Sequence, residues 1–122
     1  MVKTEMAKEY FEKLTLLVEQ LNLNDSISKN IVIKHFFSGA AFYINNTICA
    51  SWSPAGLAFK LSKKETIELI SKGKAIPLKY FPKGHIKKDY ALFKNPEKIS
   101  PEECKSYFIR AAAQSSESKL LT

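Results

Sequence analysis

Arginine, cysteine and histidine are all scarce in this chain, and each scarcity argues against a class of site. Arg110 is the single arginine among 19 basic residues, whereas specific recognition of phosphates and bases favours the bidentate guanidinium fork. The two cysteines, Cys49 and Cys104, are too few for a disulfide framework, and their apolar neighbours predict buried thiols. A reactive thiol stays open for Cys104, because it lies near the start of a predicted helix. Two histidines and two scattered cysteines also predict no metal site.

Long apolar runs and catalytic motifs are missing as well. No run approaches the roughly 20 apolar residues of a membrane-spanning helix, and the N-terminus enters an amphipathic pattern instead of a signal peptide. We therefore expect a cytoplasmic protein with no membrane partner. The chain has no phosphate loop, dinucleotide glycine fingerprint, zinc spacing or nucleophile elbow. We accordingly expect no catalytic residue, no cofactor and no enzyme activity.

Helical periodicity is clearest at the N-terminus. Apolar residues recur at spacings of three and four over residues 4–21, which predicts an amphipathic helix. Ser62 and Glu65 form a capping box that opens a second helix. This helix is expected to bury Ile67 and Ile70 and to end before Gly73 in a left-handed cap.

Strand patterns fill the region between these helices and recur after the second. Residues 31–37 are β-branched and aromatic, and Asn45-Asn46 predicts a tight hairpin turn between strands over 40–44 and 47–52. A further strand is predicted over 57–61. Two more, over 75–81 and 86–93, flank a Pro-Lys-Gly turn.

A second capping box, Ser100 to Glu103 with proline at the first helical position, opens the last helix. Cys104, Tyr107, Phe108, Ala111 and Ala112 share one face of that helix. The order is one helix, three or four strands, a helix, two strands and a helix. This order predicts an α+β two-layer sandwich, with an antiparallel sheet and its helices on one face. Residues 1–114 are expected to form a single domain, followed by a flexible tail over 115–122.

Lysine is abundant and concentrated in one region. The formal net charge is +7, and residues 61–98 hold ten lysines against four acidic residues. Residues 79–90 interleave lysines with aromatic rings, which suits a nucleic-acid surface, a partner surface, or a hairpin whose rings pack inward. Strand alternation favours the hairpin with a basic outer surface. The candidate binding residues are Lys79, Lys83, His85, Lys87 and Lys88.

Two other side chains have both a structural and a functional interpretation. Trp52 lies beside a Ser-Pro-Ala-Gly turn, either as a core or rim residue or as an anchor for a partner. By alternation His35 shares a face with Ile33 and Phe37, which predicts a core or rim histidine. A small-ligand site would require Trp52, His35 and Cys49 to line one pocket.

The order of motifs resembles that of the TfoX N-terminal domain family. Residues 36–46 are similar to the family pattern Phe-Gly-Gly-x-Gly-x-Tyr-x-x-Gly, and residues 48–50 to the strand that follows it. Residues 57–61, 73–78 and 87–90 match its later segments. The likeness covers residues 5–113, but Ser38, Ala41 and Asn46 replace family glycines.

This resemblance implies a secretion-chaperone-like fold, a bacterial protein, and a link to transcriptional regulation of DNA-uptake competence. It supplies no catalytic residue. We therefore expect a non-enzymatic regulatory or interaction module with a protein partner, self-association included. The alternative is direct nucleic-acid binding through the lysine-rich surface around residues 79–88, with affinity that falls steeply with salt.

Overall fold

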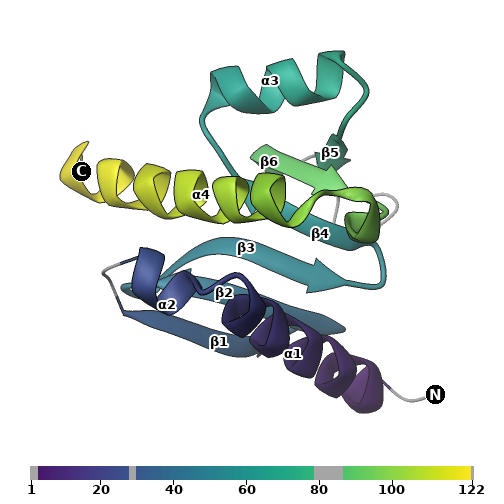
Figure 1. The fold of residues 1–122 in the computed structure, drawn as a ribbon. Coiled ribbons are helices and arrows are strands. Elements are labelled where there is room, and N and C mark those ends of the chain that lie inside the picture. Colours follow the sequence, from purple (N-terminus) through teal and green to yellow (C-terminus); the bar gives the residue numbers. More distant parts are fainter. Residues whose placement is uncertain (1–2, 28–29, 79–86, 122) are drawn as a thin grey trace.

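One six-stranded antiparallel sheet, in the order β1-β2-β3-β4-β6-β5, organises the chain (Figure 1). The computed structural model describes residues 3–27, 30–78 and 87–121. The strands are β1 (Ile31–Phe36), β2 (Gly39–Ile44), β3 (Thr47–Ser53), β4 (Gly56–Lys60), β5 (Ile76–Leu78) and β6 (Lys87–Phe93). The helices are α1 (Lys3–Gln20), α2 (Leu23–Ser26), α3 (Lys63–Ser71) and α4 (Pro101–Leu121), with a 3-10 turn η1 (Pro96–Lys98).

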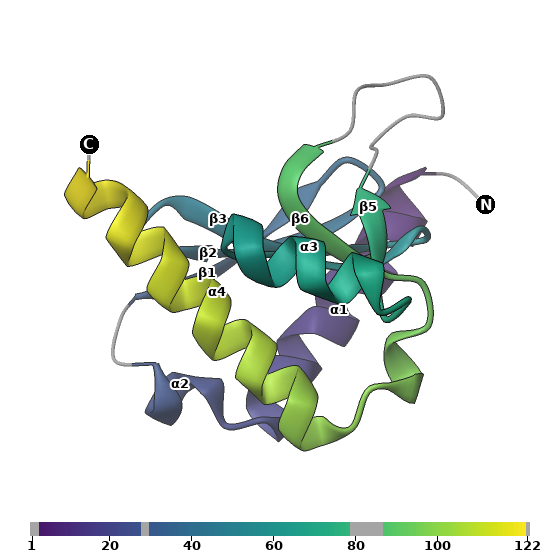
Figure 2. The same ribbon diagram turned by 90° about the horizontal axis from the view of Figure 1, so that it is seen from above.

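The helices cover one face of the sheet, as Figures 1 and 2 show from two directions. Residues from all four helices pack with the inward residues of the strands in the larger of two hydrophobic clusters. Phe42, Phe59 and Phe108 are its largest fully buried side chains, and the ring of Phe59 packs edge-on against Phe108 at 4.9 Å. The predicted α+β sandwich is therefore confirmed, including four strands before α3 and two after it.

The first helix forms where the periodicity predicts it. Leu14, Val18 and Leu21 are buried against the sheet. At Asn22 the backbone turns left-handed, with φ of 56°, and the short helix α2 follows directly. The polar cluster after residue 21 does end α1, but α2 was not expected, since four residues are too few to show a period.

Tight turns fix the register of the first three strands. Asn45 and Asn46 both have positive φ, 48° and 68°, as a two-residue hairpin turn demands, so this prediction is confirmed. Phe37 is not part of β1 as predicted but lies in the β1–β2 turn with φ of 54°. Gly39 must be glycine, because an added Cβ would lie 2.1 Å from the carbonyl oxygen of Trp52.

The second predicted helix, α3, is capped as predicted, but the face that it buries differs from the predicted one. The Glu65 amide donates to Ser62 Oγ at 3.2 Å, and Gly73 has φ of 73° just after the helix. The expectation that Ile67 is buried was wrong, since Ile67 is 56% exposed and Thr66 and Leu69 are the buried residues. Ile70 is half-buried. The helix is short and lies beside β6 and β5, so its contact face is narrow and is set by the packing of Leu69.

The last two predicted strands and the last predicted helix form, but their bounds differ from the predicted ones. β5 pairs antiparallel with β6, but β5 ends at Leu78, and residues 79–86 of the predicted hairpin lie outside the described residues. The amide of Glu103 donates to Ser100 Oγ at 3.2 Å, which confirms half of the second capping box. The α4 backbone continues to Leu121, and the flexible tail over residues 115–122 stays a prediction.

Candidate interaction site

Trp52 lies where α1 crosses the end of β3. Its ring centroid is 6.2 Å from that of Tyr10, and the Lys13 ammonium is 4.8 Å from the Tyr10 centroid and 5.9 Å from that of Trp52. The indole is half-buried against the core. The rim position predicted for Trp52 is thus confirmed, and part of its side chain is exposed to solvent.

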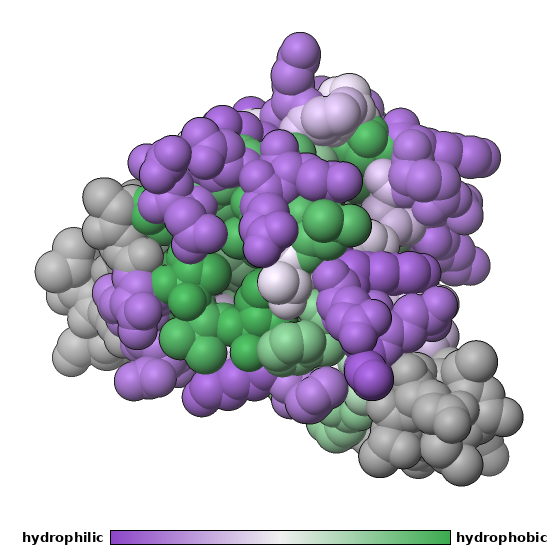
Figure 3. Space-filling model, turned by 60° about the horizontal axis from the view of Figure 1, so that its bottom comes forward, coloured by the Kyte–Doolittle hydropathy of each residue, from purple (hydrophilic) through white to green (hydrophobic). Residues whose placement is uncertain are grey.

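An apolar groove of about 620 Å³ begins at this indole and extends between α1, η1 and the start of α4. Most of its lining is aliphatic or aromatic, and Leu16 on its α1 side is 53% exposed. Figure 3 views the side of the molecule on which α1 lies and shows hydrophobic side chains around a hollow, framed by hydrophilic ones. The lining residues are Lys13, Leu16, Leu17, Gln20, Leu21, Trp52, Leu57, Pro96, Glu97, Ile99, Pro101 and Cys104.

Sequence reasoning missed most of this groove. Leu16 lies off the main apolar stripe of α1, so it was not singled out, although two adjacent leucines widen the stripe toward that side. The opposite wall comes from η1, where Pro96 and Ile99 flank a turn that has no periodic pattern. The signal available was the apolar residue Ile99 between two prolines, outside any predicted element.

The groove carries no catalytic arrangement. Lys13 and Glu97 are its charged lining residues. Burial, and then the neighbouring Glu103 carboxylate, raise the pKa of the Cys104 thiol to about 11, so the thiol is protonated at neutral pH. Burial and the raised pKa both argue against a reactive thiol at Cys104. Burial and a hydrogen bond donated to Glu103 also raise the pKa of the Tyr107 phenol.

His35 and Cys49 are not brought to Trp52. The ring of His35 stacks on Phe11 at 4.7 Å and the residue is exposed, so it lies on the face it shares with Ile33 and takes the rim position, not the core position, of the two predicted. Cys49 is fully buried, and its thiol donates to the Thr47 carbonyl at 3.4 Å. Neither residue lines the groove. The pocket that a small-ligand site at Trp52, His35 and Cys49 would require is therefore not formed by these three residues, because β3 turns the Cys49 thiol into the core.

The predicted basic surface is only partly described. Lys79, Lys83 and His85 lie outside the described residues, and for Lys87 and Lys88 the structure describes only the backbone, at the start of β6. A binding role for these five residues stays a prediction.

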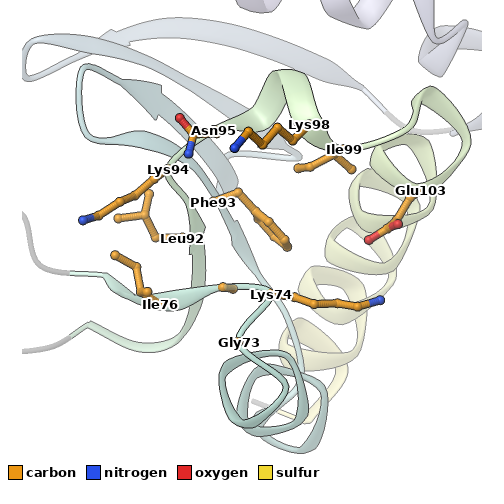
Figure 4. A pocket seen from close by; sticks show the side chains of 11 residues that line it. Gly73, Lys74, Ile76, Leu92, Phe93, Lys94, Asn95, Lys98, Ile99 and Glu103 are labelled. Carbon is orange, nitrogen blue, oxygen red and sulfur yellow. The ribbon is translucent and has the colours of Figure 1, made fainter.

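A second hollow, of about 460 Å³, lies near the same end of the sheet and is lined by Lys74, Lys94 and Lys98. In Figure 4 the side chain of Lys94 points away from the hollow, and Lys74 extends toward α4, the helix that carries Glu103. The three ammonium groups therefore do not converge on one point, as a bound phosphate would require.

Comparisons with known proteins add no relative. No protein-family model matches the chain, and no curated protein or solved structure matches it. The resemblance to the TfoX N-terminal domain therefore stays a prediction from motif order. Within residues 3–27, 30–78 and 87–121, no cluster of three metal-ligating side chains is present. Over the same part of the chain, no helix is long and apolar enough to cross a membrane.

Proposed function

We propose that the protein is a non-enzymatic interaction module that binds an acidic amphipathic helix of a partner protein in the groove beside Trp52. The observation that carries this proposal is the groove itself, about 620 Å³ and walled by apolar side chains from α1 and η1. Helix-binding grooves accept apolar anchors at positions i, i+3 or i+4, and i+7. The exposed Leu16 and the half-buried Trp52 suit such anchors.

The charge of the chain favours an acidic partner. The net charge of +7 attracts acidic segments at long range. At the groove, Lys13 stands between the Tyr10 and Trp52 rings and forms a 3.9 Å ion pair with Glu9. The two groups are half exposed, so this pair contributes little to stability and is readily exchanged for a carboxylate of the partner. Glu97 on the opposite wall would select a basic residue at the other end of the bound helix.

The resemblance to the TfoX N-terminal family supplies the biological context of this proposal. It implies a regulatory role in a bacterial cell, connected with transcription or DNA-uptake competence. No family residue is known to act in catalysis, which agrees with an interaction module. The partner helix is thus proposed to belong to a regulatory protein.

Trp52 provides the test, because it is the single tryptophan of the chain. Two synthetic helices with the same leucine face and no tryptophan, one otherwise glutamate-rich and one lysine-rich, are titrated at low salt. The glutamate-rich helix is expected to shift the Trp52 emission with saturation. The lysine-rich helix should bind at least about tenfold more weakly, a difference of about 1.4 kcal/mol.

Leu16→Glu supplies the decisive variant and Ile67→Glu its matched control. Both residues are leucine-like in size, helical and about equally exposed, but Ile67 lies on α3. Leu16→Glu should weaken binding about tenfold or more, and Ile67→Glu should leave it unchanged. Equal effects of the two variants, or no saturable emission change with either helix, would overturn the proposal.

A second candidate function is direct binding of nucleic acid. It is favoured by the ten lysines within residues 61–98, three of which line the hollow of Figure 4. This function predicts affinity for single-stranded DNA or RNA that falls steeply with salt, and loss of binding in Lys87→Glu/Lys88→Glu. No mobility shift at about 50 mM salt would exclude it.

A further inference from the structure

The outer edge of β1 is open to pairing. β1 ends the sheet, and within the described residues β2 is the only strand that pairs with it. Its sequence, Ile-Val-Ile-Lys-His-Phe, is regular, lacks proline and has no acidic residue. A regular edge strand of this kind is a template for another strand, and Lys34 is the one residue of β1 of a type that sheets use to blunt such edges.

The register shows which backbone groups point outward. The Asn45 amide donates to the Asn30 carbonyl at 3.2 Å, and this pair continues the β1–β2 register, in which Lys34 opposes Ala41. In an antiparallel ladder the hydrogen-bonded pairs alternate, so the even-numbered residues of β1 bond to β2. The N–H and C=O groups of Ile31, Ile33 and His35 therefore point away from the sheet.

We infer that β1 pairs antiparallel with β1 of a second copy of this chain, about a two-fold axis at Ile33. The outward residues are spaced evenly around Ile33, so each finds an outward residue of the second copy opposite it. Ile33 opposes itself, and Ile31 opposes His35. This register makes roughly six backbone hydrogen bonds. The two sheets become one continuous sheet, with an isologous contact.

Charge selects this register over the one centred on Lys34. A shift that centres the axis on Lys34 would place two lysines directly opposite each other and would leave roughly four hydrogen bonds. With the axis at Ile33, each Lys34 opposes Val32 of the other copy instead. Lys34 also lies 5.0 Å over the Tyr43 ring, which holds its ammonium on the face away from the helices.

Apolar contact on the helix-covered face adds to the same pairing. Ile33 packs partly buried against the core and opposes Phe42 in the neighbouring strand. Pairing at the axis places Ile33 of one copy against Ile33 of the other, so the apolar layer continues across the contact. Directly opposed apolar side chains in antiparallel pairs stabilise sheets. An unrelated strand would meet the edge without this symmetry, which is why the inferred occupant is a second copy.

Cysteine cross-linking tests the pairing and its register. In Ile33→Cys the two Cα atoms would lie about 5.5 Å apart, within disulfide range. In the control His35→Cys the two new cysteines would lie four residues apart along the strands, about 14 Å, and cannot bond. The native thiols of Cys49 and Cys104 are buried and will not compete. Mild oxidation should therefore produce covalent dimer from Ile33→Cys and not from His35→Cys.

Placing a charge at Val32, which faces Lys34 of the other copy in the inferred register, tests the pairing in solution. Sedimentation of the wild-type chain should show a monomer–dimer equilibrium. In Val32→Lys, the new lysine of each copy faces Lys34 of the other, so two like-charge pairs form and the dimer should weaken about tenfold or more. In Val32→Glu, the same positions form two opposite-charge pairs, which should strengthen the dimer. The double variant Val32→Lys/Lys34→Glu should restore it.

Several results would overturn the inference. These are a chain that stays monomeric up to about millimolar concentration, cross-linking that is equal for Ile33→Cys and His35→Cys, and Val32→Lys and Val32→Glu acting alike. Preferential cross-linking of Lys34→Cys would replace the Ile33 register by the other one. Leu16→Glu should not change the dimer, so failure of the groove proposal and failure of this inference are distinguishable.

Discussion

The two edges of the sheet are built in opposite ways. β5 has three residues, contains Pro77, shows a register shift at Pro77 and Leu78, and has α3 beside it. β1 has six residues, a regular register and β-branched side chains, with no proline. Proline, bulges and short strands are the devices by which proteins protect an edge from pairing. Within the described residues these three devices are present at β5 and absent at β1, where Lys34 is the one residue of an edge-protecting type, so β1 is the edge better suited to pairing.

The helices near the two edges also differ in the kind of side-chain contacts they make. Near β5, α4 meets α3 through Arg110, whose guanidinium lies 3.6 Å from the Glu65 carboxylate. Within α3 and its cap, Lys72 lies 2.8 Å from Glu68. The Lys72 ammonium holds the pKa of Glu68 below its usual value. Near β1, α1 contributes the aromatic stack of Phe11 on His35. The helices near β5 thus carry charged pairs, whereas α1 near β1 carries an aromatic contact.

The largest loss of stability is expected from a substitution at Gly39, where β2 and β3 approach closely. Gly39→Ala places a Cβ 2.1 Å from the Trp52 carbonyl oxygen, so β2 and β3 must separate. We expect a loss of roughly 3 kcal/mol or more in the free energy of unfolding, measured by urea denaturation. Gly73→Ala, near β5, meets no atom within 4 Å and is strained only by its φ of 73°. It should cost roughly 1 kcal/mol. Equal losses would contradict the close approach at Gly39.

Proline substitutions in β1 distinguish the backbone N–H groups that bond to β2 from those that point outward. Lys34→Pro removes an N–H that bonds to β2, whereas His35→Pro removes one that points outward. We expect Lys34→Pro to cost about 2–3 kcal/mol in unfolding free energy and His35→Pro much less, because only the first breaks the ladder. Thermal unfolding of both variants measures the difference. A larger loss for His35→Pro would reverse the assignment of the edge and with it the inferred dimer register.

The sequence allowed the sheet to be predicted better than the site. Period-two stretches, Asn45-Asn46 and the two capping boxes are local signals, and the structure follows them. Which face of α3 is buried depends on the tertiary position of Leu69, so Ile67 was misplaced. The groove could not be predicted, because Leu16 and Ile99 come from elements that meet only after folding. The open edge depends on strand order, which local patterns do not determine.

The buried Cys104 thiol, on the core-facing side of α4, makes the stability of the fold depend on pH. The folded-state pKa of Cys104 is raised to about 11 from an ordinary value of 9.0. The unfolded chain therefore loses this proton first, so stability is full below pH 9 and falls as the pH rises through 11. The contribution is on the order of 2 kcal/mol. Alkaline denaturation should show the decline, and Cys104→Ala should flatten it between pH 9 and 11; an unchanged slope would show that the thiol is accessible to water.

The smallest effect concerns the exposed tip of the β1–β2 hairpin. Phe37 has φ of 54° and is 64% exposed, and a left-handed backbone disfavours an aromatic residue by about 1–2 kcal/mol. Phe37→Gly relieves that strain but adds chain entropy to the unfolded state. We expect a net gain of roughly 0.5–1 kcal/mol in unfolding free energy, read from urea denaturation.

Ser38→Gly is the matched control for this substitution, because Ser38 is the neighbouring turn residue and does not have positive φ. It should lower the stability by up to about 1 kcal/mol. If Phe37→Gly also destabilises the chain, the Phe37 ring, 4.6 Å from the ring of Phe36, stabilises the hairpin by more than the backbone strain costs. A gain in stability together with a weaker dimer would instead assign the ring to the contact between copies. That outcome would extend the contrast with β5 from the backbone of β1 to the tip of its hairpin.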